Sequence, residues 1–252
     1  MLSGVCQSEP AGLPTSGLHA HYTVDGWQAS TGVWQDQSGN GRHSIQSSGV
    51  VSSASLTSAG YRTTFLQGGL DGYITFPVGS VPTDFTVCSI SRYTSSDPLK
   101  RKRVLNAQSF YWIHGHHEGK VGAAWYGDTF GWVSDRTIIP ASEAGNWLVF
   151  CGQNKPVDNV IVANGIDVTL ANGGTGNVQL SVNSGFNDGT EKREWAVKDI
   201  VIWSRHLTRS EIYGAASFLR NQVEVHVVCG RLPHMYSQAC SCIQGHFHTL
   251  ML

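Results

Sequence analysis

The 252-residue chain is long enough to bury a substantial core, and its length suits one large all-β domain or two small ones, of which we expect one. Only 14% of the residues are charged, 10% are aromatic and 29 are glycine, which excludes a disordered chain and is typical of short strands joined by many turns. The 17 Lys and Arg residues nearly cancel the 18 Asp and Glu residues, which argues against nucleic acid or an anionic membrane as a partner. No apolar run approaches the roughly 18 residues of a membrane-spanning helix, so we expect no membrane insertion.

The chain begins with an N-terminal segment, residues 1–17, that lacks the basic start and the apolar stretch of a signal peptide, so we expect no secretory address in it. A first strand follows in GLHAHYTVDGW, and residues 33–45 then read VWQDQSGNGRHSI. Gly39 and Gly41 permit the left-handed backbone angles of tight turns. Asp36 would either accept hydrogen bonds from the amides of this turn or offer its carboxylate to a calcium ion.

Short strands are predicted along the rest of the first two thirds of the chain. Apolar residues on both alternating faces of residues 84–93, DFTVCSISRY, predict a central strand that is covered on both sides, and residues 146–154, NWLVFCGQN, have the same character. Cys88 and Cys151 lie within these two stretches, where we expect free thiols that behave as small hydrophobic side chains. Asn164-Gly165 is a strong signal for a two-residue hairpin turn.

The apolar period changes near Thr208, where a strand gives way to a predicted helix. Thr208 and Glu211 fit a capping box, and apolar residues recur at helical spacing on one face, at Ile212, Ala215, Ala216 and Leu219. Residues 223–252 have no clear period and are interpreted as an irregular tail.

Three segments together resemble the laminin-G-like jelly-roll domains of the concanavalin A-like lectin/glucanase superfamily. They are WQDQSGNGRH, LQGGLDGYITFP and AVKDIVIWSRHLTRSEIYGAASFLR, and the resemblance covers roughly residues 18–221. It implies a two-sheet antiparallel sandwich with a short C-terminal helix, and it implies use outside the cell or at its surface. In such domains the W-x-D-x-S-G-N-G loop is structural, so we favour Asp36 as a turn organiser.

This superfamily includes sugar-binding modules, adhesion domains and glycan-cleaving enzymes, so the function depends on site residues. Retaining glycan hydrolysis needs two carboxylates about 5 Å apart, usually from an E-x-D-x-E strand, and that pattern is missing. Glu191 and Glu194 are close in sequence, but their spacing places them on opposite sides of an extended chain, where we expect solvated side chains. No G-x-S-x-G motif occurs either, so we expect that the chain is not an enzyme, with a glycan hydrolase as the weak alternative.

Residues 111–132 combine the aromatic and planar polar side chains that sugar recognition requires. The residues predicted to bind a glycan are His114, His116, Trp125, Tyr126, Asp128 and Trp132. The alternative is that several of these side chains belong to the core, and for His114, Trp112 and Trp125 we favour the core.

Metal sites are weakly indicated. Calcium is the usual inorganic partner of the superfamily, and the candidate ligands are Asp36, Asn40 and Asp71, although turns explain these residues better. The tail offers a C-x-C-x3-H-x-H set that could bind zinc, but its spacing is poor for a zinc site and we favour an incidental tail; the set comprises Cys240, Cys242, His246 and His248. KRKR at residues 100–103 is interpreted as a solvated hairpin loop.

The sequence therefore predicts an N-terminal segment over residues 1–17, one jelly-roll domain over residues 18–222 and a tail over residues 223–252. The expected function is a non-catalytic module that binds a carbohydrate or a protein ligand, and we expect the module to belong to a larger multidomain protein. The rival hypothesis is a structural domain in which the same aromatic residues are buried.

Overall fold

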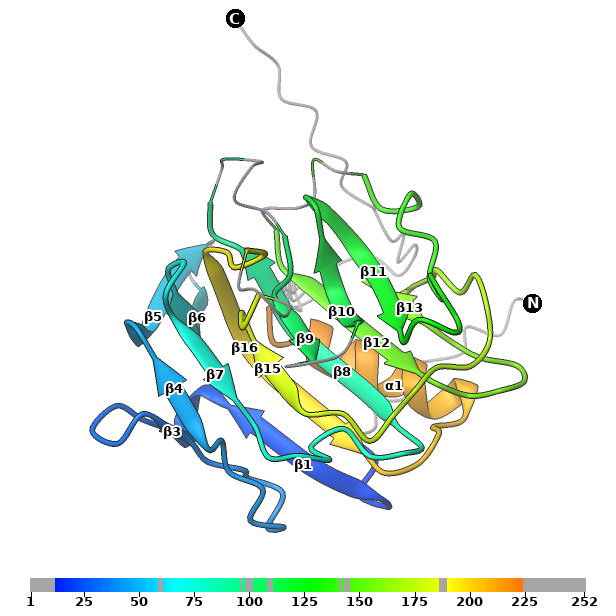
Figure 1. Ribbon diagram of the computed structural model, residues 1–252, viewed down its shortest axis with the longest axis horizontal. Coiled ribbons are helices and arrows are strands. Elements are labelled where there is room, and N and C mark those ends of the chain that lie inside the picture. The colour runs from blue at the N-terminus through cyan, green and yellow to red at the C-terminus, as the bar shows by residue number, and fades with distance from the viewer. Residues whose placement is uncertain are drawn as a thin grey trace, which may run out of the picture.

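The computed structural model describes residues 12–58, 61–95, 97, 102–107, 111–140, 142, 146–185 and 190–223. These residues form two antiparallel β-sheets packed face to face, with one helix on the outside (Figure 1). The predicted all-β, jelly-roll-like sandwich with a short C-terminal helix is confirmed. Within the described residues, no helix is both long and apolar enough to cross a membrane.

The larger sheet has the strand order β14-β13-β12-β8-β16-β6-β5, and β1 also pairs with β16. Its strands are β1 (Leu18–Thr23), β5 (Val51–Ser58), β6 (Tyr61–Gly68), β8 (Thr86–Tyr93), β12 (Leu148–Gln153), β13 (Val162–Ala163), β14 (Ile166–Asp167) and β16 (Trp195–Trp203). The central position predicted for residues 84–93 is confirmed, because β8 lies between β12 and β16 and nearly all of its residues are buried. The Asn164-Gly165 turn joins β13 to β14, and both of its residues have positive φ, at 48° and 82°.

The smaller sheet has the order β11-β10-β9-β15-β7-β4. Its strands are β4 (Gln46–Ser48), β7 (Tyr73–Thr75), β9 (Leu105–Ala107), β10 (Trp112–His117), β11 (Lys120–Tyr126) and β15 (Leu180–Val182). A short 3-10 helix, η1 (Val24–Gly26), leads into a separate two-stranded ribbon of β2 (Trp27–Gln28) and β3 (Val33–Trp34). The main hydrophobic core fills the space between the two large sheets.

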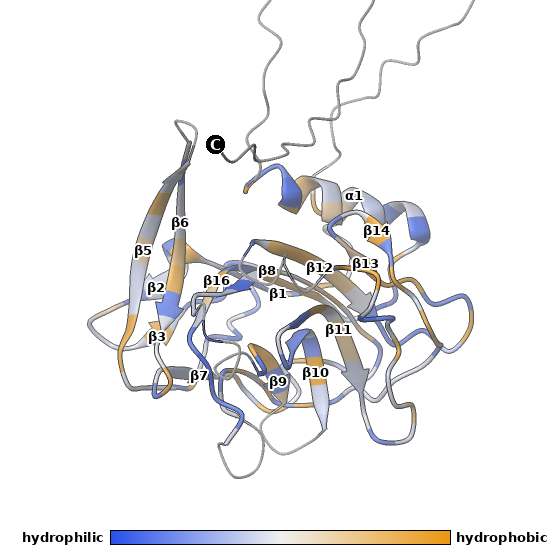
Figure 2. Ribbon diagram, turned by 90° about the horizontal axis from the view of Figure 1, so that it is seen from above, coloured by the Kyte–Doolittle hydropathy of each residue, from blue (hydrophilic) through white to orange (hydrophobic). Residues whose placement is uncertain are grey.

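The helix α1 (Arg209–Arg220) lies on the outer face of the larger sheet, over β8 and β12 (Figure 2). Thr208 Oγ1 accepts a hydrogen bond from the Glu211 amide, and the Glu211 carboxylate accepts one from the Thr208 amide, so the predicted capping box is confirmed. The predicted apolar face is also confirmed, since all four of its residues are buried: Ile212, Ala215, Ala216 and Leu219. A second hydrophobic core lies between this face and the sheet.

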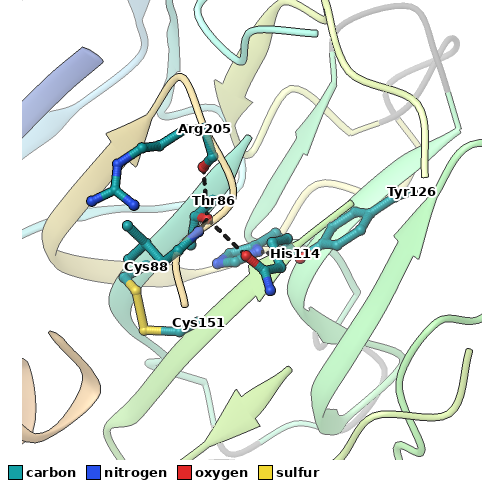
Figure 3. Close-up of a disulfide and its surroundings, with 8 residues drawn as sticks. Thr86, Cys88, His114, Tyr126, Cys151 and Arg205 are labelled. Carbon is teal, nitrogen blue, oxygen red and sulfur yellow. Dashed lines mark hydrogen bonds between the residues drawn. A yellow bond between two sulfur atoms is a disulfide. The ribbon is translucent and has the colours of Figure 1, made fainter. Parts of the chain in front are cut away.

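The expectation of free thiols at Cys88 and Cys151 is wrong. These residues face each other across β8 and β12, with their Cα atoms 4.0 Å apart, and they form a buried disulfide beneath α1 (Figure 3). Two independent apolar strand patterns gave no indication of this pairing, because it depends on which strands are neighbours and in which register.

Candidate functional site

Three of the predicted glycan contacts lie inside the sandwich, which corrects their assignment to its surface. Trp112, His114 and His116 of β10 all lie on the inner face of the smaller sheet, although the register with β11 shifts between Gly115 and His116. His114 and Tyr126 lie side by side (Figure 3), with His114 Nδ1 2.8 Å from Tyr126 Oη. The His114 ring also stacks on Trp112. His114, His116 and Tyr126 have no exposed surface, so they cannot touch a ligand outside the protein.

The environment of the two histidines favours their neutral form. Burial lowers the pKa of His114 and of His116 to about 3 in each case, because a charged imidazolium loses its hydration there. The His116 ring packs edge-on against Tyr93, with the ring centroids 4.7 Å apart. These histidines are therefore core residues, which is the alternative that the sequence left open for His114.

The other predicted contacts lie on or near the outer face of the smaller sheet. Trp125 and Trp132 form an isolated β-bridge, and their rings meet edge to face at 5.0 Å. The guanidinium of Arg136 lies 3.8 Å from the centre of the Trp132 ring, so it occupies part of the ring that a sugar would use. Both tryptophans are half-buried, whereas Asp128 is exposed in the loop that follows β11.

The proposed calcium ligands serve other purposes in the structure. The Asp36 carboxylate accepts hydrogen bonds from the amides of His21, Ser38 and Arg42 and from the Ser38 hydroxyl, at 2.8–3.0 Å. Burial opposes ionisation of Asp36, but these four donors outweigh it and lower the pKa of the carboxyl. Asp36 therefore organises the turn, as favoured from the sequence.

Asn40 completes the same turn, because its side-chain amide donates to the Leu18 and His19 carbonyls. Asp71 lies in the exposed turn between β6 and β7. The described residues hold no group of three or more His, Cys, Asp or Glu side chains that could bind a metal ion. The zinc candidates of the tail, Cys240, Cys242, His246 and His248, lie outside the described residues.

Two further expectations need correction. Arg103 of the KRKR run is completely buried rather than solvated, and it forms an ion pair with Glu191. Glu191 is therefore not a free carboxylate. Lys102 pairs with Glu118, with Nζ 3.1 Å from Oε1, at the tip of the β10–β11 hairpin.

The structure reveals a groove that the sequence analysis missed, at the end of the sandwich where the loop after β11 lies. It has a volume of about 460 Å³, and Phe130, whose exposed fraction is 42%, forms one wall. A glycine-rich segment, residues 173–176, also lines the groove. Gly173 has a φ of +87°, and a Cβ atom there would lie 2.5 Å from the Phe130 ring, so only glycine lets the ring and the backbone meet.

Asn154 fixes the loops around this groove. Its Oδ1 accepts from the Phe85 amide at 3.0 Å, and its Nδ2 donates to the Thr83 and Gly174 carbonyls at 2.8 and 3.2 Å. Two segments that are far apart in sequence, residues 83–85 and the segment of Gly174, are thus tied to one side chain. Such prior fixing lowers the entropy that a ligand must remove on binding.

A second, larger cleft of about 690 Å³ adjoins the groove, and the two share Asn172 as a wall. Its lining is predominantly polar and carries Lys155, Asp158, Asp167 and Arg209. Arg209 and Asp167 form an ion pair at 3.0 Å, which holds the start of α1 against the end of β14. Burial opposes ionisation of Asp167, but hydrogen bonds from Thr169 and Arg209 outweigh it and lower the pKa of the carboxyl.

The only indication of these two depressions in the sequence was the run ANGGTGNV, residues 171–178. Three glycines within four residues signal a close approach of the backbone to something else, but they do not say to what. The partner, Phe130, lies more than forty positions earlier in the chain, so the pattern alone could not identify the groove.

Comparisons with known proteins show the fold alone. The sequence matches no protein-family profile and no curated protein. One similar solved structure is domain 4 of AbnA, a GH43 extracellular arabinanase from Geobacillus stearothermophilus, in complex with arabinotriose. It aligns with a TM-score of 0.55 at 16% identity, and the alignment covers 82% of this chain and 98% of that one. The binding domain of Paraclostridial Mosquitocidal Protein 1 aligns with a TM-score of 0.53 at 12% identity, over 80% of this chain and 52% of that one. A Trypanosoma rangeli sialidase mutant displaying trans-sialidase activity aligns with a TM-score of 0.53 at 14% identity, over 84% of this chain and 34% of that one.

Proposed function

We propose that the protein is a non-catalytic glycan-binding module of the concanavalin A-like, laminin-G-like kind, and that Phe130 is its sugar platform. The carrying observation is the groove in which the exposed Phe130 ring faces the glycine-rich backbone of residues 173–176. An aromatic ring binds the apolar face of a sugar. The Gly173 and Thr175 amides and the Gly174 carbonyl already make hydrogen bonds within the protein, so sugar hydroxyls would donate to carbonyl oxygens of this segment, each of which can accept two hydrogen bonds. In this proposal the groove replaces the buried part of the predicted contact surface, and Phe130 follows Asp128 of that surface by two residues in the loop after β11.

The similarity to AbnA domain 4 supports this proposal, since that domain was solved with arabinotriose and the alignment spans nearly all of it. The toxin binding domain among the structural neighbours is compatible with a module that recognises a surface ligand. The buried Cys88–Cys151 disulfide favours an oxidising compartment, because structural disulfides are rare in the cytosol. We therefore propose that the module acts outside the cell or at its surface.

The residues of the two depressions support binding rather than hydrolysis. A glycan hydrolase needs one carboxyl group whose pKa is raised, so that it can donate a proton to the leaving group. Asp158 and Asp167 line the larger cleft and Asp84 lines the groove, and of these three Asp167 is engaged by Arg209 and its pKa is lowered. Glu191, which the sequence analysis expected to be a solvated side chain, is paired with Arg103.

A glycan microarray probed with the full chain tests the proposal, with Phe130→Ala as the variant and Leu56→Ala as the matched control. Leu56 has the same exposed fraction as Phe130, 42%, and lies on β5, on the projecting β5–β6 hairpin away from the groove (Figure 2). We expect wild type and Leu56→Ala to bind the same glycans and Phe130→Ala to lose them. Absence of binding by the wild type would favour a protein-binding or structural domain instead.

A further inference from the structure

We infer that the polar cleft beside the Phe130 groove is a second subsite, so that the protein recognises a neutral oligosaccharide of several units rather than a single sugar. This inference rests on the proposed function, because it concerns the same ligand. It starts from the volume of the cleft, about 690 Å³, which lies in the usual range for ligand sites and exceeds that of the groove. Two adjoining depressions offer room for successive units of one chain.

The boundary between the two depressions shapes the path of the ligand. Gly173 N donates to the Lys155 carbonyl at 2.8 Å, and the Asn172 Oδ1 atom accepts from the Asn159 amide at 3.0 Å. These bonds fix the segment of Asn172, an exposed residue that lines both depressions. A linear oligosaccharide that occupied both depressions would therefore pass Asn172.

The charge of the cleft points to a neutral ligand. Lys155 and Arg209 supply two positive charges, and Asp158 and Asp167 supply two negative ones, so the lining has no net charge. Arg209 and Asp167 already neutralise each other at 3.0 Å, whereas Lys155 and Asp158 form no ion pair with any of the described residues. A carboxylate or sulfate on the ligand would gain from Lys155 and lose to Asp158, but a hydroxyl group can donate to one and accept from the other.

The inner wall of the cleft adds a buried amide. Gln153 lines the cleft and is completely buried, and its Oε1 accepts from Thr86 Oγ1 at 3.1 Å. Its Nε2 atom has no hydrogen-bond partner among the described residues. The single hydroxyl proton of Thr86 is shared between Gln153 Oε1 and the Arg205 carbonyl, which lies 3.0 Å from Thr86 Oγ1, and this contact anchors the wall to the segment before α1 (Figure 3). A buried donor without a partner is unusual, and a ligand hydroxyl or a water molecule held by the ligand would satisfy it.

The test is calorimetric titration of the full chain with neutral linear oligosaccharides of one to six units, drawn from arabinan, xylan, glucan and mannan, together with oligogalacturonates as acidic probes. The double variant Lys155→Met/Asp158→Asn removes the two unpaired charges. Asp158 has a φ of +52°, and asparagine tolerates that angle. The control is Lys102→Met/Glu118→Gln, which makes the same charge change at the far end of β10 and β11, where Glu118 has a similar φ of +50°.

We expect affinity for a neutral series to rise over at least three units in the wild type and in the control. The double variant should weaken the longer oligosaccharides by roughly tenfold or more, the scale of one hydrogen bond to a charged group, and leave the shortest binding ligand unchanged. Any of three results would overturn the inference, even if Phe130→Ala still abolishes binding. The affinity could stop rising after the first unit, the double variant could bind as the wild type does, or the protein could prefer oligogalacturonates. If no series binds, the proposed function fails and the inference fails with it.

Discussion

The buried histidines predict that the fold loses stability in mild acid. In the unfolded chain a histidine has a pKa of about 6.5, whereas burial lowers the pKa of His114 and of His116 to about 3 in the fold. The unfolded state therefore binds more protons between these values. The stability due to each neutral histidine is fully present above pH 6.5 and is lost as the pH falls below it.

The size of the effect follows from this difference. At pH 5, which is about 1.5 units below the pKa of an unfolded histidine, protonation stabilises the unfolded chain by roughly 2 kcal/mol per histidine. The folded chain does not gain this free energy, because its two histidines stay neutral at pH 5. Two histidines give roughly 4 kcal/mol, a large part of the 5–15 kcal/mol that stabilises a typical domain. Carboxylates and other groups also contribute to the pH dependence, so the comparison must be made between variants.

Urea unfolding at pH 7 and pH 5 measures the effect, with His114→Phe as the variant and Tyr126→Phe as its control. Both changes remove the hydrogen bond of 2.8 Å between the two side chains, but only the first removes a titrating group. From pH 7 to pH 5, His114→Phe should lose about 2 kcal/mol less stability than the wild type, and Tyr126→Phe should lose as much as the wild type. Equal losses in all three proteins would refute the reasoning, because His114 would then not be held neutral in the core.

Three further predictions concern the scaffold. Reducing the Cys88–Cys151 disulfide, which closes a loop with a sequence separation of 63, should lower the free energy of unfolding by about 4 kcal/mol in a urea titration, and an unchanged midpoint would contradict this. Thr208→Ala removes the N-cap of α1 and should cost about 1 kcal/mol in the same assay, whereas Thr208→Ser should cost much less. Asp36→Ala should lower the thermal midpoint, because four hydrogen bonds are lost. Neither calcium nor EDTA should shift the midpoint of the wild type. A rise of the midpoint on addition of calcium would contradict the turn role and mean that Asp36 binds metal.

The features that sequence predicted well are those set by neighbouring residues. The capping box of Thr208 and Glu211, the apolar face of α1 and the Asn164-Gly165 hairpin each depend on a few consecutive positions, and all three are confirmed. The turn role of Asp36 belongs to the same class, because three of its four hydrogen bonds come from within six residues. Local chemistry leaves little choice at such sites.

The features that sequence missed depend on which strands and loops become neighbours. The alternation of β10 fixes that His114 and His116 share a face, but not that this face is the inner one. In the same way, the disulfide depends on the pairing of β8 with β12, and the groove depends on the contact of Phe130 with Gly173. Aromatic and histidine residues suit a core as well as a sugar site, so composition alone could not separate the two.

The central claim is that a sugar binds in the groove of Phe130, and mapping of amide chemical shifts by NMR tests it most directly. The full chain, labelled with nitrogen-15, would be titrated with the oligosaccharide that binds best on the array. The account predicts that the largest shifts fall in residues 128–131 and 172–176, on the two walls of the groove. Shifts concentrated around Trp125 and Trp132, or on the β5–β6 hairpin, would contradict it.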